Sequence, residues 1–305
     1  MIPKKVSVVV TVLNEEKSIG NLLNALLSQT KKADEIIIVD GGSGDSTQEV
    51  VEYYSSKLNT FENIKLYIKR GNRSVGRNYG ISKAKNEIIA ITDAGAFPAT
   101  DWLEKITDPF SQREVNIVSG YYKPNSKTTF QKAVAPYFLV MPDKLTPGME
   151  FLPSSRSVAI KRQVWEKINY PQKYKHNEDY IWDLELKKSG FKFYFKPDAI
   201  VFWSPPRSFK IFFKQIYRFA KGDSEAGIKR PKIKYIYLRY LVGLALLIAQ
   251  QYIIFLLMFL VYVAWSVQKN FRYAKMVESF YLLPTIQIGS DIAVMIGDLR
   301  GKLRI

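Results

Sequence analysis

The sequence predicts an α/β protein whose mostly parallel sheet is flanked by helices and is followed by one or more apolar helices. Two observations lead to this fold class. Apolar, β-branched runs typical of buried strands alternate with segments of helical periodicity over the first hundred residues. A later run, residues 240–268, contains no charged residue, and its length suits a membrane.

The first strand is expected at 6–12, and the spacing of Ile and Leu predicts a helix over 18–29. Three more strands are expected at 35–39, 64–69 and 87–92, separated by helices at 47–58 and 74–85. Right-handed crossovers bring the carboxyl ends of these strands to one edge of the sheet, where ligands of open α/β sheets bind. The polar residues at that edge are Asn14, Glu15, Asp40 and Asp93.

The composition excludes several kinds of site. The absence of Cys excludes disulfides, thiolate metal ligands and a Cys nucleophile. A single His argues against a His-rich metal site and a Ser-His-Asp triad. Neither a P-loop nor a G-x-G-x-x-G motif occurs, which disfavours P-loop and dinucleotide-binding proteins. Carboxylates are therefore the expected base and metal ligand.

The formal net charge of +17 requires an anionic partner, and its distribution indicates which one. The segment from Arg207 to Arg239 carries a net +8, and the segment from Lys269 to the end carries +3. Both segments flank the uncharged run, so the charge indicates attachment to membrane lipids. We expect no nucleic-acid partner, because the basic residues flank an apolar run instead of a nucleic-acid-binding platform.

The last third of the chain is expected to attach the protein to a membrane. A transmembrane helix is expected over 238–268, with a buried core helix as the alternative. Residues 207–237 are expected to form a basic amphipathic region in the lipid interface, or else to pack on the soluble domain. Residues 269–305 are expected to form a second span or an interfacial helix with a basic tail. Because the N-terminal segment has the pattern of a strand and no signal-peptide cleavage site, we expect the domain before the span in the cytoplasm, at the cell membrane.

The charged residues at the sheet edge suit a nucleotide with its phosphates. Asp40 opens a Gly- and Ser-rich turn, where a carboxylate can accept hydrogen bonds from a base or ribose, although such residues also make ordinary turns. Arg70, Arg73 and Arg77 can bind a diphosphate, or simply provide surface charge. Asp93, at a strand end, can hold a divalent ion that bridges phosphates.

Four segments in this order resemble glycosyltransferase family 2. They read VSVVVTVLNEE, IIIVDGGSGDST, GRNYGISKAKNEIIAITDAG and NEDYIWDLELKKSG, and the resemblance covers about residues 4–222. It implies a GT-A fold, with a nucleotide-sugar-binding half at 1–118 joined to an acceptor-binding half at 119–206. It also implies an inverting transfer of a hexose from a nucleotide-diphosphate sugar.

The resemblance assigns a donor site. The residues implied to line the nucleotide and its diphosphate are Thr11, Val12, Leu13, Glu15, Asp40, Arg73 and Arg77, where the two arginines lie near the diphosphate or brace that part of the fold. Asp93 is implied as the first acid of the family's metal-binding Asp-x-Asp motif, which requires Mg²⁺ or Mn²⁺. Gly95 stands in place of the second acid, so Asp93 anchors the ion alone through the diphosphate, or another group contributes. Asp101 is a candidate for that group, although it also suits a helix cap.

The resemblance also assigns the catalytic pair. Asp179 is implied as the general base that deprotonates the acceptor, with Glu178 beside it positioning acceptor or donor. Acidic residues at the start of a helix also suit the helix dipole, so helix capping is the alternative.

Further residues are implied to contact the acceptor, the donor sugar or a phosphate. They are Ser154, Ser155, Arg156, His176, Gln215 and Arg218. A polar strand edge is the alternative for the first three, and an exposed loop is the alternative for His176. Gln215 and Arg218 have the spacing of the Gln-x-x-Arg-Trp motif of processive members, with Phe219 in place of Trp.

Together these observations predict a membrane-anchored, metal-dependent glycosyltransferase of glycan biosynthesis. It would take a nucleotide-activated sugar in the cytoplasm and pass it to a lipid-linked or polyprenyl-phosphate acceptor. Two alternatives stay open: a polyprenyl-phosphate hexose synthase, whose acceptor is the lipid phosphate itself, and a GT-A scaffold without activity.

Overall fold

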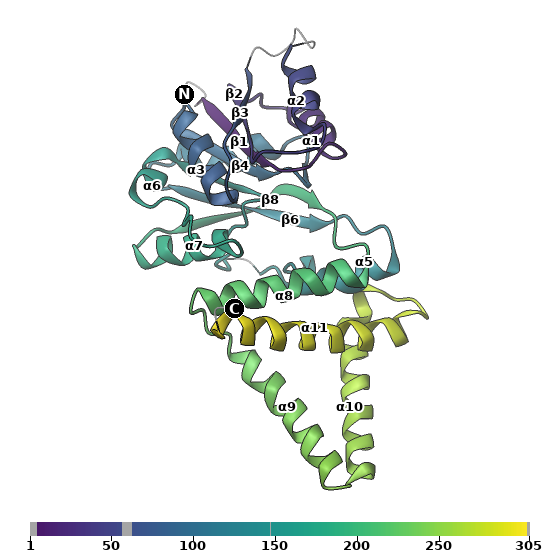
Figure 1. The fold of residues 1–305 in the computed structure, drawn as a ribbon. Coiled ribbons are helices and arrows are strands. Elements are labelled where there is room, and N and C mark those ends of the chain that lie inside the picture. The colour runs from purple at the N-terminus through teal and green to yellow at the C-terminus, as the bar shows by residue number, and fades with distance from the viewer. Residues whose placement is uncertain (1–4, 57–62, 147, 304–305) are drawn as a thin grey trace. The chain divides into compact units, whose positions relative to one another are not determined.

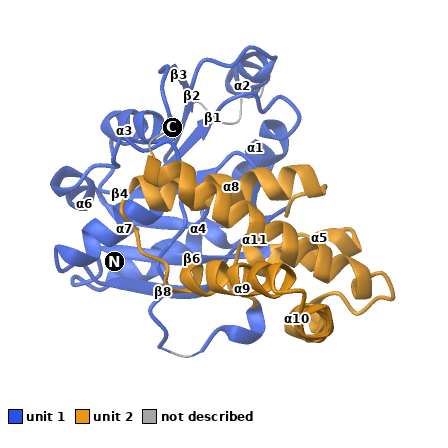
Figure 2. Ribbon diagram, turned by 60° about the horizontal axis from the view of Figure 1, so that its bottom comes forward, with its two compact units in different colours: residues 1–123, 142–204 blue, residues 124–141, 205–305 orange. Residues whose placement is uncertain are grey.

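The computed structural model describes residues 5–56, 63–146 and 148–303. The chain divides into two compact units, which Figure 2 colours separately. The sheet unit contains residues 1–123 and 142–204, and the helical unit contains residues 124–141 and 205–305. The chain therefore enters the helical unit twice.

The sheet unit begins with four parallel strands that alternate with helices, as the sequence predicts (Figure 1). The strands are β1 (Val6–Val12), β2 (Glu35–Asp40), β3 (Ile64–Ile68) and β4 (Ile88–Asp93). The helices between them are α1 (Ile19–Leu27), α2 (Thr47–Ser56) and α3 (Arg73–Lys83). The order of elements expected from the strand and helix periodicities is confirmed.

The same sheet continues into the second half of this unit and has the order β3-β2-β1-β4-β7-β6-β8-β5. The added strands are β5 (Ala96–Pro98), β6 (Ile117–Pro124), β7 (Val158–Lys161) and β8 (Phe193–Trp203). Strand β7 pairs antiparallel with both β4 and β6. The boundary expected after residue 118 falls inside β6, so the two expected halves share one sheet.

Helices pack on both faces of this sheet. Those in the second half are α4 (Trp102–Thr107), α6 (Arg162–Lys167) and α7 (Glu178–Lys188), with 3₁₀ helices at Asp108–Ser111 and Pro142–Lys144. Leu22 and Trp102 belong to the core on one face, and Ile81 and Trp182 belong to the core on the other. Strands β1, β2 and β4 are therefore buried on both faces, which explains their continuous apolar sequence.

Two glycines let α3 approach the sheet closely. A Cβ atom at Gly76 would lie 2.9 Å from Cγ2 of Thr11, and one at Gly80 would lie 2.6 Å from Cγ1 of Val9. Real Cβ atoms do not make such short contacts, so larger side chains would push the helix away from β1. The glycines of the GRNYG segment thus serve helix–sheet packing and hold α3 over the strand ends.

The helical unit contains five α-helices among its described residues. They are α5 (Thr129–Val134), α8 (Phe209–Glu225), α9 (Pro231–Ile248), α10 (Tyr252–Asn270) and α11 (Ser279–Leu303), with 3₁₀ helices at Ala135–Tyr137 and Phe271–Tyr273. Helices α8 and α11 lie side by side (Figure 1). Phe212 and Ile216 of α8 share a buried core with Leu283 and Ile286 of α11. The basic amphipathic helix expected within 207–237 is α8, and its apolar face packs on α11.

The uncharged run does not form the single helix expected over 238–268. Helix α9 ends at Ile248, and α10 begins at Tyr252. Gln250 adopts a left-handed conformation with φ of 56°, and the N–H groups of Gln250 and Gln251 donate to the carbonyls of Leu247 and Leu246 at 3.1 and 2.9 Å. This is the Schellman arrangement that closes a helix C-terminus, so the run is divided between two helices.

Two helical segments of the described residues are long and apolar enough to cross a membrane, by length and composition. They are Tyr252–Tyr273, whose apolar window is 6% buried, and Ser279–Leu303, whose window is 50% buried. Few residues of the first segment are therefore buried, whereas half of those in the window of the second are buried. These segments fit the apolar C-terminal helix or helices that the sequence predicts.

Candidate active site

The candidate site lies at the carboxyl edge of the parallel strands. Thr11, near the end of β1, pairs with Val39 of β2 on one side and with Asp93 of β4 on the other. Val12 pairs with Asp40 at the end of β2. The fold therefore brings the expected nucleotide-lining residues of β1 together with both carboxylates.

The loops after β1 and β2 are bound to each other. The N–H of Asn14 donates to Oγ of Ser43 at 2.8 Å, and the N–H of Gly44 donates to Oδ1 of Asn14 at 2.9 Å. The N–H of Glu15 donates to Oγ1 of Thr47 at 2.7 Å. The two sequence motifs that contain these residues thus form one loop structure at the strand ends.

The side chain of Asp40 also stabilises this loop structure. This side chain is fully buried, and its carboxylate accepts hydrogen bonds from the N–H and the hydroxyl of Ser43, at 3.1 and 2.6 Å, and from the amide of Gln48. The carboxylate therefore holds the turn in the free chain. Its expected contact with a base or ribose stays a prediction.

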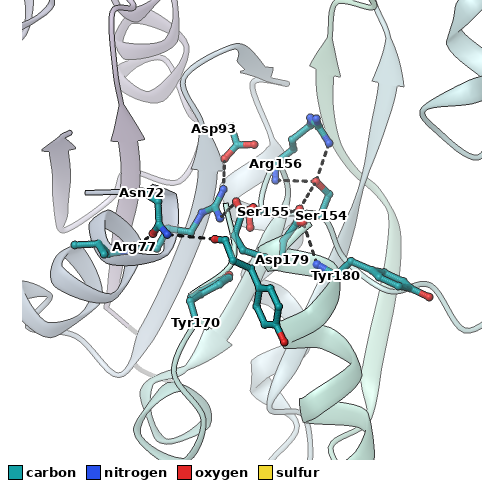
Figure 3. Close-up of polar contacts among 12 residues, drawn as sticks. Asn72, Arg77, Asp93, Ser154, Ser155, Arg156, Tyr170, Asp179 and Tyr180 are labelled. Atoms are coloured by element: carbon teal, nitrogen blue, oxygen red, sulfur yellow. Dashed lines mark hydrogen bonds and ion pairs between the residues drawn. The ribbon is translucent and has the colours of Figure 1, made fainter. Parts of the chain in front are cut away.

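Arg77 links the two halves of the site. Its guanidinium donates to Oδ1 of Asp93 at 3.0 Å (Figure 3). It also donates to Oε1 of Glu178 at 2.8 Å. Arg77 and Glu178 are 2% and 5% exposed, whereas Asp93 is 27% exposed. Since the guanidinium is buried between two carboxylates, its contacts favour the brace among the two expected roles, and the role itself stays a prediction.

The charges of this cluster keep it ionised. Burial raises the pKa of the Asp93 carboxyl, but the charges of Arg77, Arg156 and Arg73 lower it more, so the pKa lies below its usual value. The pKa of the Arg77 guanidinium is raised, because the charges of Asp93 and Glu178 outweigh the effect of its burial. Asp93 is therefore a carboxylate at neutral pH and is open to solvent on one side.

The residues around Asp93 offer few metal ligands. The described part of the chain contains no group of three or more His, Asp or Glu side chains arranged to hold a metal ion. Asp101 pairs with Lys105 at 2.7 Å at the start of α4. Gly95 is exposed, and a Cβ atom there would contact nothing within 4 Å. Asp93 would thus be one oxygen ligand of a divalent ion bound here, and the described side chains around it would not complete the coordination alone.

Asp179 lies beside the serines that the sequence analysis assigned to the acceptor side. Its Oδ2 accepts from the hydroxyl of Ser154 and from the N–H of Ser155, both at 3.4 Å, contacts that are long for hydrogen bonds (Figure 3). Ser154 in turn accepts from Nη1 of Arg156 at 2.9 Å. The structure therefore brings residues 154–156 and Asp179 together.

Arg156 is held between two aromatic rings that the sequence analysis missed. Its guanidinium carbon lies 5.3 Å from the ring centre of Tyr122 and 4.8 Å from that of Trp203. Cation–π contacts of this kind fix the orientation of a guanidinium without neutralising its charge. No local pattern in the sequence identifies these rings, because they come from β6 and β8.

Asp183 is a second acid that the sequence analysis missed. It follows Asp179 by one turn on α7 and is 1% exposed. Burial, and then the charge of Asp179, raises the pKa of Asp183 well above its usual value. The i, i+4 spacing of two acids was the signal that could have revealed it.

The other assigned residues have less defined surroundings. His176 is half-buried in the loop before α7, and Leu13 and Arg73 are exposed at the sheet edge. Gln215 and Arg218 lie on α8 of the helical unit, where Gln215 is half-buried and Arg218 is exposed. The ligand contacts of all these residues stay predictions.

The fold thus contains the sheet edge, its two linked loops and the acidic pair at the start of α7. Residues 7–167, more than half of the chain, match the family described as Glycosyl transferase family 2. The chain belongs to this family. It is a glycosyltransferase.

Curated relatives of this glycosyltransferase include two transferases. Glycosyltransferase AglE of Haloferax volcanii is 27% identical over 226 residues, covering 72% of each chain. A dolichyl N-acetyl-alpha-D-glucosaminyl phosphate 3-beta-D-2,3-diacetamido-2,3-dideoxy-beta-D-glucuronosyltransferase of Methanococcus voltae is 27% identical over 234 residues, covering 71% of this chain and 73% of the relative.

Solved structures share the GT-A fold of this glycosyltransferase. Mannosyltransferase PcManGT from Pyrobaculum calidifontis, in complex with GDP-Man and Mn²⁺, has a TM-score of 0.64 and 19% identity over 97% of this chain and 87% of that one. TarS of S. aureus, in complex with UDP-GlcNAc, has a TM-score of 0.52 and 18% identity over 71% of this chain and 65% of that one. At these identities the likeness shows the fold.

Proposed function

We propose that this glycosyltransferase inverts the anomeric configuration and transfers a hexose from a nucleotide-diphosphate sugar to a lipid-linked acceptor, with Asp179 as general base. One observation carries the proposal. Arg77 binds both Asp93, at the donor edge of the sheet, and Glu178, the neighbour of Asp179. A single buried side chain thereby fixes the candidate diphosphate site relative to the candidate base.

The transfer would follow from this arrangement. An acceptor hydroxyl attacks the anomeric carbon and loses its proton to the Asp179 carboxylate. The bond between that carbon and the diphosphate oxygen breaks, and the diphosphate leaves with the electron pair. Attack from the face opposite the leaving group inverts the configuration.

The donor diphosphate would lie near Asp93. A carboxylate that is ionised and partly exposed suits Mg²⁺ or Mn²⁺ bridged to phosphates, and such an ion would neutralise the charge of the leaving diphosphate. Arg156 and Arg73, whose charges act on Asp93, would add positive potential at the same place.

The membrane and the lipid-linked acceptor are supported by the helical unit and by one relative. Helix α10 exposes a long apolar surface, and basic residues flank the uncharged run at both ends. The Methanococcus voltae relative bears the name of a transferase acting on a dolichyl phosphate-linked sugar. We propose that the chain acts on a carrier of this chemical class from the cytoplasmic face of the membrane.

Substitution of Asp179 tests the base. We expect D179N to lose on the order of 10²–10⁴-fold in transfer, while nucleotide binding measured by isothermal titration is retained. Glu185 is exposed on the same helix, so E185Q is the matched control and should transfer normally. Full transfer by D179N would refute the base assignment. A modest loss with a polyprenyl phosphate acceptor would favour the hexose synthase, because an ionised phosphate needs no strong base.

A panel of UDP-, GDP- and dTDP-sugars, titrated with and without Mn²⁺, tests the donor. Binding of one nucleotide-sugar, tightened by the ion, is the expected result. Failure of every donor to bind or to be turned over would favour a scaffold without activity.

A further inference from the structure

Helices α9 and α10 form an apolar hairpin with little protein around it. The two helices meet at the turn Ala249–Gln251 and run in opposite directions (Figure 1). Large apolar side chains more than half exposed occur along both: Leu241, Leu244, Ile248, Ile253, Leu257 and Val261. A continuous surface of this kind is unfavourable in water and indicates a lipid or protein partner.

The helices before and after the hairpin are packed on each other. Gly289 of α11 faces the ring of Phe209, Gly297 faces the carbonyl of Tyr217, and Gly301 faces the carbonyl of Lys221. Each of these glycines is so close to α8 that a Cβ atom would approach it within 2.6 Å or less. Residue numbers rise along both helices in these contacts, so α8 and α11 are parallel neighbours.

Helix α11 contains acidic residues that are paired with other helices of the unit, which does not suit a helix that crosses a bilayer alone. Its two acids, Asp291 and Asp298, are 1% and 3% exposed. Asp291 pairs with Arg239 of α9 and accepts from the hydroxyl of Tyr262 of α10 at 2.7 Å. Asp298 is bound by Ser224 of α8 and Lys302 at 2.5 and 2.6 Å. These pairs tie α11 to every other long helix of the unit.

The basic residues mark one end of the hairpin. At its open end, where α9 begins and α10 ends, one group precedes the apolar part of α9: Lys229, Arg230, Lys232 and Lys234. A second group lies at the end of α10 and just after it: Lys269, Arg272 and Lys275. The turn at its other end carries no charge. Helix α10, with 19 residues, is about 28 Å long, close to the ~30 Å thickness of a hydrocarbon core. The positive charge at the open end suits the anionic headgroups of a lipid layer. The uncharged surface of the rest of the hairpin suits the hydrocarbon beneath them.

We propose that the hairpin enters the lipid bilayer from one face and returns to that same face. Helices α8 and α11 stay at the face of entry as a pair, and Gln250 and Gln251 are the deepest residues. The segment before Pro231 and the segment after Asn270 therefore lie on the same side of the membrane. A single span over 238–268 would instead place them on opposite sides, which the packing of α8 on α11 does not permit. The proposal rests on the membrane association in the proposed function and is independent of catalysis.

Because the chain contains no Cys, single cysteines can report their side of the membrane without background. Suitable exposed positions are Glu52 on α2, Gln251 at the turn and Leu303 at the end of α11, giving E52C, Q251C and L303C. The full chain is expressed, and a membrane-impermeant maleimide is applied to sealed right-side-out and inverted vesicles. Unchanged nucleotide binding confirms that each variant is folded.

We expect E52C and L303C to label together in one vesicle orientation and to be protected together in the other. Q251C should not label from the side that labels E52C. Labelling of L303C from the side opposite to E52C would establish a single span and overturn the proposal. Labelling of Q251C together with E52C would show that the hairpin is not inserted and would overturn it equally. A failure of sugar transfer would leave these labelling results unaffected, so the two proposals fail separately.

Discussion

Arg77 and Glu178 form a buried ion pair at 2.8 Å that joins the second turn of α3 to the first residue of α7. The same guanidinium also binds Asp93 at 3.0 Å. A buried cation with two carboxylate partners is strongly destabilised when either side is removed, because the remaining charges lose their compensation. The pair therefore determines both the stability of this region and the geometry of the candidate site.

Removal of the Arg77 guanidinium should destabilise the sheet unit. We expect R77A to lower the free energy of unfolding by about 3–5 kcal/mol, since Asp93 and Glu178 become unpaired. R77K should also be impaired, because an ammonium cannot bind both carboxylates in the planar geometry. Urea unfolding measures the effect. R73A, at an exposed position on the same helix, is the control and should change stability by less than about 0.5 kcal/mol. Equal stability of R77A and wild type would contradict this role.

A second acid at position 95 should strengthen metal binding. The site beside Asp93 has room, because a Cβ atom at Gly95 contacts nothing within 4 Å and the residue is exposed. We expect G95D to bind Mn²⁺ on the order of tenfold more tightly in the presence of the donor nucleotide, since an added carboxylate raises the charge of the ligand set. Titration calorimetry measures the affinity. G95N has the same shape without the charge, and an equal gain by G95N would rule out this explanation.

The pH dependence of stability should reveal the raised pKa of Asp183. Its pKa is raised in the folded protein above the usual 3.8, so the folded state binds more protons than the unfolded state at any pH between the two values. Stability is then lost as the pH rises through this window, by at most about 1.4 kcal/mol for each pH unit. D183N abolishes this loss, so its stability relative to wild type should increase from pH 4 upward. Urea unfolding between pH 4 and pH 8 tests this. E185Q, on the exposed face of α7, should keep the wild-type slope, and a D183N slope equal to wild type would refute the expectation.

For the glycines of α3, we predict the direction in which a substitution changes the stability of the protein. Replacement of a helical Gly by Ala usually stabilises a helix by about 1 kcal/mol. At Gly80 the new methyl group would meet Val9 at 2.6 Å, so G80A should instead destabilise the protein by about 1–3 kcal/mol through overpacking. Thermal unfolding measures the change. G44A, where the added atom meets nothing within 4 Å, should be near neutral. Stabilisation by G80A would show that the helix can move away from β1 at no cost.

The parallel part of the fold could be predicted from the sequence because its signal is local. Each of β1, β2 and β4 is buried on both faces and is therefore apolar at nearly every position. The edge that collects Asp40 and Asp93 then follows from the handedness of the crossovers. The GT-A fold and the roles proposed for Asp93 and Asp179 were expected only from the family resemblance.

Other features depend on contacts that no local pattern encodes. Arg77 is separated from Glu178 by about a hundred residues. The sequence alone therefore does not show that the two side chains meet, and it leaves Arg77 as either a brace or a diphosphate ligand. The rings around Arg156 come from two further strands. The break between α9 and α10 lies at Gln250, which adopts the left-handed conformation usually taken by Gly. Because no Gly marks this position, the sequence of the uncharged run predicts one helix.

The parallel pairing of α8 with α11 imposes an order on assembly. Helix α8 is synthesised before the hairpin, and the surface that covers Phe212 and Ile216 arrives only after it. During synthesis the apolar face of α8 is thus uncovered, and under the proposed topology insertion of the hairpin would return α11 to its side at high effective concentration. Removal of residues 279–303 would leave α8 permanently in that exposed state, so a chain lacking them should aggregate or be degraded before its sheet unit can act.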